Sequence, residues 1–342
     1  MRLAFTKKIL IKAIVITTAI CALSYGAVVF ARDFRMLQPV PGFTTFLDKK
    51  DICSIVISYN EGGNDIIWVG GSNGLFRVHN GISEKIGNYR YVKALLVIED
   101  EIWIGHDQGI TILKGENIKT FTKKEGLPDN RVNALCADSK GAIWAGTWGG
   151  VAVFDGGVLK RTLTSKDGLI DNMINVIMQD NSGGMWFGSY VAPRGGLCVF
   201  YKDEWQYFTV EDDLLHSNIN AVIQLKNNDV IAGGGLYMKG GGTVFAFDNA
   251  KWSAVSKISK NDGLAGAKIR SLMEDGKKRL WVGSEYEGLA VIDNGISKII
   301  TVKNGLSNNE VKCMVEDSVG TIWIGTRMGL VRIEKGGLEN VR

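Results

Sequence analysis

A Trp-x-Gly triplet recurs along this chain, with its Trp at Trp68, Trp103, Trp144, Trp186, Trp281 and Trp323. Successive anchors lie 35 to 42 residues apart, except for one gap of 95 residues. Within that gap the segment SNINAVIQLKNNDVIAGG, which begins at Ser217, aligns with DNRVNALCADSKGAIWAGT, which begins at Asp129. The alignment places Ile231 at the Trp position. The chain therefore contains seven repeats, of which six keep the Trp.

A repeat of about 40 to 45 residues accommodates four short strands, the unit of a β-propeller blade. A typical repeat holds the apolar runs VNALCAD, AIWAGT and GVAVFDG, separated by turns rich in Gly, Asp, Asn and Ser, and then a variable fourth run. The second run is apolar throughout, which is typical of a strand covered on both faces. The sequence therefore predicts an all-β fold, a seven-bladed β-propeller of four-stranded blades, over residues 42–342.

The anchor Trp residues are predicted to be core spacers and not ligand-stacking residues, because periodic apolar positions usually belong to a core. A Trp ring fills the wedge between twisted sheets, and its N–H is expected to reach a backbone carbonyl. The Gly two residues later is expected to allow a close backbone approach at the blade edge.

The seventh repeat ends without a fourth strand, whereas residues 43–50, FTTFLDKK, resemble the fourth strand and turn that precede the third repeat. We therefore expect residues 42–47 to join the blade made by residues 309–342. Pairing of these N- and C-terminal strands closes the ring and leaves no open sheet edge at the seam.

Residues 1–31 have the composition of an export leader. They carry Arg2, Lys7, Lys8 and Lys12 and no acid, and residues 13–31 are uncharged and mostly apolar. This pattern predicts a signal peptide or a membrane anchor helix, followed by a linker at residues 32–41. Val29-Phe30-Ala31 fits a small-x-small cleavage site, whereas the length of the apolar stretch nearly suffices to span a bilayer. Both outcomes place the propeller outside the cytoplasm, either soluble in the periplasm or tethered to the inner membrane by residues 13–31.

Outside the leader the chain is formally neutral, with 36 Lys and Arg residues against 36 Asp and Glu residues. A basic field for nucleic acid is absent, so nucleic acid is not an expected partner. The remaining cysteines, Cys53, Cys136, Cys198 and Cys313, are expected to be buried thiols. Only Cys53 and Cys313, in the units that meet at ring closure, are candidates for a disulfide. No Cys/His spacing indicates a metal site, and no cofactor is expected.

The repeats GLPDNRVNALCADSKGAIWAGTWGGVAVFDG, from Gly126, and GLSNNEVKCMVEDSVGTIWIGTRMGLVRIEKG, from Gly305, closely resemble the two-component regulator propeller repeat. The resemblance rests on the GL-x-x-N entry, the D-x-x-G-x-[IM]-W turn and the G-[TS]-x-x-G-[LV] that follows. It covers nearly the whole exported part. Repeats one and two lack the GL-x-x-N entry, and repeat five lacks the Trp and carries an insertion.

Propellers of that family are commonly the extracytoplasmic, ligand-sensing halves of membrane histidine kinases. This sequence holds a single propeller and no room for a phosphoacceptor-His helix or an ATP-binding domain. The resemblance therefore implies a sensor or binding module without kinase activity of its own. Such a module is expected to act with a separate membrane signalling protein, such as a histidine kinase, in trans.

Propellers place two sets of loops on one rim: those that join second to third strands, and those that join a fourth strand to the next first strand. Binding residues often lie in such loops, because the blades hold them rigidly. The first set offers aromatic and charged side chains suited to a polar, ring-bearing small molecule such as a glycan. The ligand-binding candidates are His106, Asp107, Trp148, Tyr190, Arg194, Tyr237, Lys239, Glu285, Tyr286, Glu287 and Arg327.

A polar residue also recurs one position after the leading aliphatic residue of the first strand, where it is expected to face the central channel. These channel-lining candidates are Lys93, Asn133, Asn175, Asn220, Arg270 and Lys312. The alternative is that they bond only water and neighbouring backbone groups.

Two further classes remain open. A protein-binding scaffold uses a rigid rim equally well. Some propellers with similar repeats resemble streptogramin-inactivating lyases, which depend on His, Glu and a divalent metal. Here His79 is expected on the opposite rim, whereas His106 and His216 belong to distant units. No catalytic residue is predicted, and the protein is expected to be a monomeric binding module and not an enzyme.

Overall fold

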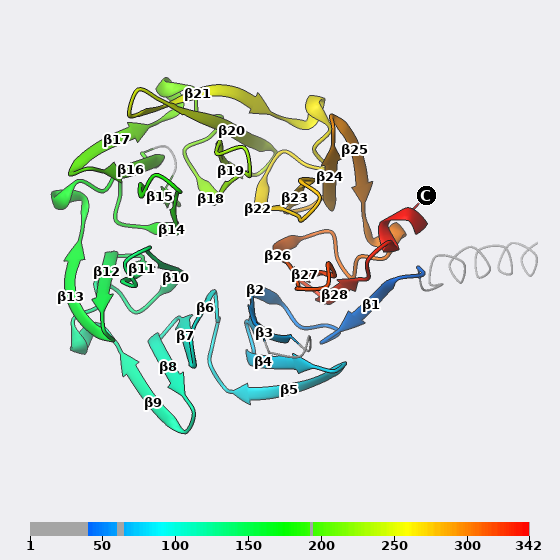
Figure 1. Ribbon diagram of the computed structural model, residues 1–342, viewed down its shortest axis with the longest axis horizontal. Helices are drawn as coiled ribbons and strands as arrows, with labels where there is room; N and C mark the ends of the chain where they lie inside the picture. Colours follow the sequence, from blue (N-terminus) through cyan, green and yellow to red (C-terminus); the bar gives the residue numbers. More distant parts are fainter. Residues whose placement is uncertain (1–39, 60–64, 192–193, 342) are drawn as a thin grey trace, which may run out of the picture. The chain divides into compact units, whose positions relative to one another are not determined.

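The computed structural model describes residues 40–59, 65–191 and 194–341. The compact unit runs over Pro41–Arg342. The leader predicted at residues 1–31 lies outside the described residues, as does the predicted linker up to residue 39. Within the described residues, the compact unit contains seven antiparallel sheets of four strands each, arranged in a ring (Figure 1). The predicted seven-bladed, all-β propeller is therefore confirmed.

The blades follow one another in chain order around the ring. Blade 1 contains β2 (Ile52–Ser58), β3 (Ile66–Gly71), β4 (Gly74–His79) and β5 (Ile82–Gly87). Blade 2 contains β6 (Ala94–Ile98), β7 (Glu101–His106), β8 (Gly109–Lys114) and β9 (Asn117–Phe121). Blade 3 contains β10 (Val132–Ala137), β11 (Ile143–Thr147), β12 (Gly150–Asp155) and β13 (Val158–Leu163). Blade 4 contains β14 (Ile174–Gln179), β15 (Met185–Ser189), β16 (Leu197–Tyr201) and β17 (Glu204–Phe208).

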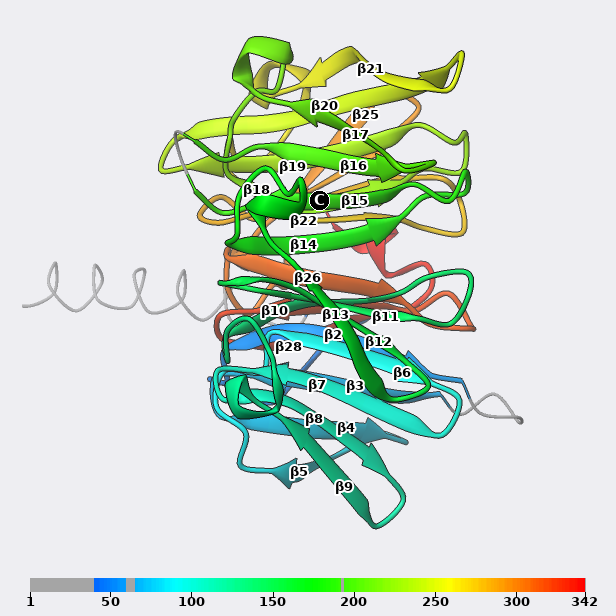
Figure 2. The same ribbon diagram turned by 90° about the vertical axis from the view of Figure 1, so that its left-hand side faces the viewer.

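The remaining blades complete the ring. Blade 5 contains β18 (Ile219–Gln224), β19 (Val230–Leu236), β20 (Lys239–Asp248) and β21 (Lys251–Ile258). Blade 6 contains β22 (Ile269–Glu274), β23 (Leu280–Ser284), β24 (Leu289–Asp293) and β25 (Ile296–Ile300). Blade 7 contains β26 (Val311–Glu316), β27 (Ile322–Thr326), β28 (Gly329–Ile333) and β1 (Phe43–Phe46). In each blade the first of these strands faces the centre of the ring (Figure 1), and Figure 2 shows the strands running between the two rims.

Short 3-10 turns occupy five connections between a fourth strand and the next first strand. They are η1 (Lys123–Glu125), η2 (Ser165–Asp167), η3 (Val210–Asp212), η4 (Lys260–Asp262) and η5 (Val302–Asn304), and η6 (Gly337–Asn340) follows β28. In the part of the chain that the structure describes, none of these helices has the length and apolar character needed to cross a bilayer.

Strands from the two ends of the compact unit close the ring. Strand β1 pairs antiparallel with β28, with Phe43 opposite Ile333 and Phe46 opposite Leu330. The ring centroid of Phe46 lies 5.6 Å from that of Trp323. The expected addition of residues 42–47 to the last blade is therefore confirmed, and Figure 1 shows β1 beside β28. The seam carries both ladder pairing and aromatic packing.

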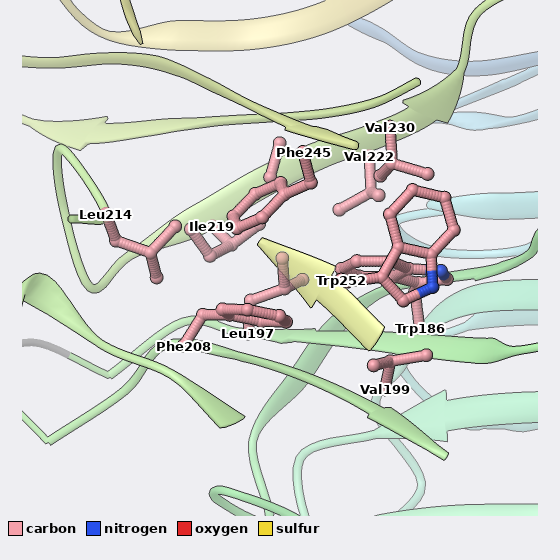
Figure 3. Close-up of a cluster of buried hydrophobic side chains, with 11 residues drawn as sticks. Trp186, Leu197, Val199, Phe208, Leu214, Ile219, Val222, Val230, Phe245 and Trp252 are labelled. Atoms are coloured by element: carbon pink, nitrogen blue, oxygen red, sulfur yellow. The ribbon is translucent and has the colours of Figure 1, made fainter. Parts of the chain in front are cut away.

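The anchor Trp side chains lie in the wedges between blades. All six are buried, with at most 8% of the residue exposed. Figure 3 shows Trp186 of blade 4 against Trp252 and Phe245 of blade 5, and the ring centroids lie 5.0 and 5.7 Å from that of Trp186. The anchors are therefore core residues, as predicted.

The expected backbone acceptor for the indole N–H is wrong. In four blades the acceptor is a carboxylate six residues before the Trp, in Asp138, Asp180, Asp275 and Asp317, at 2.7 to 2.9 Å. The same carboxylates accept backbone N–H groups of the turn between first and second strands, and such charge-assisted bonds are short and strong. Blade 5 has Leu225 at the Asp position and Ile231 at the Trp position. Both partners are thus absent from the same blade.

The Gly after each anchor meets the next blade and not the free edge of its own blade. A Cβ atom on Gly188 would lie 2.7 Å from Cγ2 of Ile219, the leading aliphatic residue of blade 5. The equivalent glycines, Gly70, Gly105, Gly146, Gly233, Gly283 and Gly325, would each bring a Cβ within 2.7 Å of the corresponding Val or Ile. The close approach at these glycines was predicted, but it occurs between neighbouring blades and not at the edge of one blade.

Four cysteines lie in the described residues, and all are free thiols. Burial raises the pKa of the Cys198 thiol to about 12. The alternative of a disulfide between Cys53 and Cys313 is therefore excluded in this structure.

Candidate functional site

A β-bulge turns the channel-lining candidates toward the centre of the ring. The register between β10 and β11 shifts between Val132 and Ala134, which leaves Asn133 without a partner in the ladder. The same shift occurs at Asn175, Asn220, Arg270 and Lys312. A bulge re-aims the side chain of the extra residue, so a polar side chain can leave an otherwise apolar strand. In blade 2, Lys93 directly precedes β6.

All six channel-lining candidates border one cavity of about 320 Å³, together with Cys53, Trp148 and Tyr190. We call it the channel cavity. Cys53 stands at the bulge of blade 1, between Ile52 and Ser54. Every blade of the described propeller therefore contributes one residue to the channel cavity, from its first strand or, in blade 2, from the position directly before it. Cys53 was not predicted because the recurring position was recognised by its polar residues. Alignment of Ile52-Cys53-Ser54 with the same triplet of other repeats was the available signal.

Three of the channel residues are amides that join neighbouring blades. Each Nδ2 donates a hydrogen bond to the carbonyl oxygen of the leading residue of the next blade. These bonds join Asn133 to Ile174, Asn175 to Ile219 and Asn220 to Ile269, with N–O distances of 3.0, 3.0 and 2.8 Å. Bonding to neighbouring backbone groups thus accounts for these three residues, and it holds them in fixed orientations.

The other polar channel residues are basic, and two of them have acidic neighbours. Lys312 donates to Asp51 at 2.5 Å and lies 3.5 Å from Glu310. The Arg270 guanidinium lies 3.8 Å from Glu285 and 3.9 Å from Glu310. Lys312 is thus firmly paired, whereas the distances at Arg270 are too long for direct hydrogen bonds.

The positive charge of Lys93 is not compensated by a neighbouring carboxylate among the described residues. Among the described residues, no carboxylate lies within ion-pair distance of its ammonium group, and its one hydrogen bond goes to Oδ1 of Asn133 at 3.4 Å. Lys93 is an exposed residue, and its side chain lines the channel cavity. Burial and the positive charges of Arg270, Lys312 and Arg131 lower the pKa of Lys93. The channel therefore concentrates positive charge.

A second cavity, of about 330 Å³, opens on the same rim between blades 2 and 3. It shares Lys93, Asn133 and Trp148 with the channel cavity, so the two are contiguous. Its other lining residues are Tyr91, His106, Asp107, Arg131 and Val132. The Arg131 guanidinium carbon lies 4.0 Å from the centroid of the Trp148 ring, within the range of a cation–π contact. We call this cavity the side pocket.

His106 lines the side pocket, and both of its ring nitrogens are engaged within blade 2. Nδ1 accepts the backbone N–H of Gln108 at 3.2 Å, and Nε2 lies 3.0 Å from Oγ1 of Thr111. The hydrogen bond at Nδ1 assigns the proton to Nε2. Burial lowers the pKa of His106, and the charge of Asp107 partly opposes this. The neutral ring therefore supports the wall of the side pocket.

The structure brings four of the rim candidates, His106, Asp107, Trp148 and Tyr190, to the two cavities. The other seven do not line either of them. Glu285 pairs with Lys268, Glu287 pairs with Lys260 at 2.6 Å, and Arg327 lies 3.8 Å from Glu310. Tyr237 is 74% exposed at the tip of the β19–β20 hairpin. Lys239, Tyr286 and Arg194 are also exposed.

Residues two positions before the channel-lining residues form a second layer that was not predicted from the sequence. They are Asp51, Tyr91, Arg131, Met173, Asn218, Lys268 and Glu310. Residues i and i+2 of a strand point to the same side, which was the available signal. Tyr91 and Arg131 line the side pocket, and Asp51 and Glu310 pair with Lys312.

The GL-x-x-N entry builds the connection that leads to this layer. Gly126 adopts a left-handed conformation (φ 102°) at the end of η1, and Leu127 is buried. Oδ1 of Asn130 accepts the backbone N–H of Lys123 at 2.7 Å. A left-handed residue at this position favours Gly, so the motif residues position the rim and do not themselves form the cavities.

A family model covers both the motif residues that position the rim and the residues that line the cavities. The model described as "Two component regulator propeller" matches residues 126–149, 168–191, 263–286 and 305–328. Each match begins at the Gly after a 3-10 turn and ends in the loop after the second strand of the next blade. Each therefore includes one channel-lining residue and one rim loop.

Solved structures share the fold. The extracellular domain of BT3049 from B. thetaiotaomicron, named as a hybrid two component system, superposes with a TM-score of 0.72 at 20% identity and covers 88% of this chain and 42% of that chain. The extracellular domain of BT4673 from the same organism superposes with a TM-score of 0.67 at 18% identity, and covers 85% of this chain and 39% of that chain. Virginiamycin B lyase from Staphylococcus aureus superposes with a TM-score of 0.63 at 12% identity, and covers 85% of this chain and 97% of that chain. This chain thus spans about two fifths of the length of the first two. No curated protein matches the sequence.

Proposed function

This chain belongs to the two-component regulator propeller family, and from that premise we propose that its propeller is an extracytoplasmic ligand-binding sensor. It acts as the signal-input component for a separate membrane signalling protein, such as a histidine kinase. Its ligand is a small molecule that enters the channel cavity and the side pocket from the rim.

The contiguity of the two cavities is the observation that carries the proposal. Ligand sites are concave, largely preformed, and combine apolar or aromatic walls with a few fixed polar groups. Here Trp148 supplies an aromatic wall common to both cavities, Tyr190 adds a second at the channel, and the interblade amides are fixed polar groups. The extracellular domains of two proteins named as hybrid two component systems have the same fold, which supports sensing outside the cytoplasm.

A protein-binding scaffold is the second candidate. The hairpin tip at Tyr237 and Met238 favours it, because these side chains are 74% and 63% exposed and lie away from both cavities. Exposed aromatic and Met side chains are enriched at protein interfaces. The likeness to virginiamycin B lyase concerns the fold, and we propose no reaction for this chain.

Thermal unfolding of the protein with a panel of glycans and metabolites tests the sensor. A ligand at one hundred times its dissociation constant stabilises the native state by about 2.7 kcal/mol. We expect one compound class to raise the melting temperature of the wild type and of Tyr237→Ala, but not of Trp148→Ala or Tyr190→Ala. The scaffold is favoured instead if no compound shifts the melting temperature and a membrane protein is captured by the wild type but not by Tyr237→Ala.

A further inference from the structure

Positive charge occupies one continuous arc of the channel cavity. Arg270, Lys312 and Lys93 come from blades 6, 7 and 2, and Cys53 of blade 1 stands between the last two. Asn residues of blades 3, 4 and 5 complete the circle. No Asp or Glu is among the described residues that line this cavity. The charge is therefore arranged to one side and is not balanced within the cavity.

Pairing outside the cavity leaves part of this charge uncompensated. Lys312 bonds Asp51 directly, Arg270 has carboxylates at 3.8 and 3.9 Å that do not hydrogen-bond it, and Lys93 has no carboxylate within ion-pair distance among the described residues. Like charges held together in a partly enclosed space repel one another, and protein screens them less well than water does. An anion between them relieves this repulsion, so the arc is suited to an acid group.

The amide arc restricts what else the channel can recognise. The Nδ2 groups of Asn133, Asn175 and Asn220 already donate across blades. Oδ1 of Asn220 accepts from Asn175 at 3.2 Å, and Oδ1 of Asn133 accepts from Lys93. These bonds hold the amides in fixed orientations, and the basic side chains are the charged groups that remain to bind a ligand.

The side pocket adds a place for the rest of the molecule. The Lys93 ammonium lies 5.9 Å from the centroid of the Trp148 ring, so an acid group at Lys93 brings its attached atoms next to that ring. Tyr91, 47% exposed, and the buried Val132 provide further apolar surface in the same pocket. A flat or apolar group fits these walls better than a second charge.

We propose that the site takes a small organic acid, with its carboxylate, sulfate or phosphate between Lys93, Arg270 and Lys312 and its ring or apolar part in the side pocket against Trp148 and Tyr91. This inference rests on the proposed function and names the ligand class of the same site. The acid group sets the charge requirement, whereas the side pocket selects among acids.

Matched acid and neutral probes test the inference on the full chain. The probes are benzoate against benzamide, glucuronate against glucose, and phenyl phosphate against phenol, up to millimolar concentration. We expect at least one acid to raise the melting temperature and to quench Trp fluorescence, with its neutral partner inactive. Inorganic phosphate and sulfate report the head group alone, and they should bind more weakly than the ring-bearing acid.

Variants separate this site from general surface charge. Lys93→Gln should weaken binding of the acid at least tenfold, Lys93→Arg should retain it, and Lys239→Gln, on the rim away from both cavities, should leave it unchanged. Neutral compounds that bind in a Trp148-dependent manner, unaffected by Lys93→Gln, overturn the acid inference and leave the sensor in place. If neither acids nor neutral compounds of the wider panel bind, both proposals fail.

Discussion

The indole nitrogen of Trp186 donates a 2.7 Å hydrogen bond to the carboxylate of Asp180, six residues earlier in the chain. The other carboxylate oxygen accepts the backbone N–H groups of Ser182 and Gly184 at 2.8 and 2.9 Å. Both partners are buried, with 0% and 4% of the residue exposed, so water cannot replace the bond. One carboxylate thus joins the turn between β14 and β15 to the ring that fills the wedge against blade 5.

Removal of both partners should cost less than the sum of the two single removals. Asp180→Leu leaves the indole and two backbone N–H groups without an acceptor, and we expect a loss of about 2–4 kcal/mol. Trp186→Ile should lose about 3–5 kcal/mol through a cavity. The double variant places Leu and Ile at these positions, as blade 5 has at Leu225 and Ile231. Its unfolding free energy should fall by about 1–2 kcal/mol less than the sum of the two single losses. Urea unfolding measures the cycle, with the exposed Asp155→Leu as the control, and strict additivity would contradict the coupling.

Acid should weaken the equivalent bond in blade 6. Burial raises the pKa of Asp275, but hydrogen bonds from Trp281 and Arg279 outweigh it and hold the pKa below its usual value. The folded-state pKa is therefore lower than the unfolded one. The stabilisation is complete above the unfolded pKa of about 3.9 and is lost as pH falls through the folded pKa.

Asp275→Asn should therefore flatten the dependence of stability on pH below about pH 4, while it lowers stability at neutral pH. Urea midpoints between pH 2 and pH 7 check this. Asp155→Asn, at an exposed site, should follow the wild type throughout. If the profile of Asp275→Asn runs parallel to that of the wild type, the depressed pKa of Asp275 contributes nothing to acid sensitivity.

Contact between blades should not tolerate a methyl group at the Gly of the triplet. A Cβ atom on Gly188 would lie 2.7 Å from Cγ2 of Ile219 and 2.7 Å from Cγ1 of Val176. Neither side chain can move away within its packed wedge, so Gly188→Ala should lower stability by about 1–3 kcal/mol. Gly242→Ala is the matched control, because its closest contact, at 3.2 Å, is the mobile end of Ile231. Equal losses for the two variants would refute the argument.

Ring closure should depend on β1. Phe46 packs 5.6 Å from Trp323 and pairs with Leu330, so Phe46→Ala should lower the unfolding free energy by about 2–3 kcal/mol. Thr44→Ala, at an exposed position of the same strand, should change it by less than about 0.5 kcal/mol. Deletion of residues 42–47 opens the seam and should lower the melting temperature sharply. An unchanged melting temperature after that deletion would show that the seam does not hold the ring.

The repeat predicted the blades because blade structure is local. A four-stranded meander is encoded by periodic apolar runs and turns, and the triplet marks the second strand of each unit. The channel-lining position was also predictable, since it recurs at one place in the repeat. Cys53 was missed at that position because the position was recognised by its polar residues. The Asp that accepts the indole N–H of the Trp was missed because Asp is favoured in turns for local reasons, so its recurrence did not indicate a bond to the Trp.

Rim residues followed no such rule. Loops vary from blade to blade, so Trp148 and Tyr190 line the channel cavity whereas the exposed Tyr237 does not.

By itself the sequence determined the number of blades, the strand order, the seam and the core anchors, because each depends on spacing within or between adjacent repeats. Only the tertiary structure decided that Lys93, Arg270 and Lys312 share one cavity and that no carboxylate among the described residues pairs with Lys93. Ring closure brings blades 6 and 7 beside blades 1 and 2, and the balance of charge in a channel depends on that three-dimensional neighbourhood and not on distance along the chain.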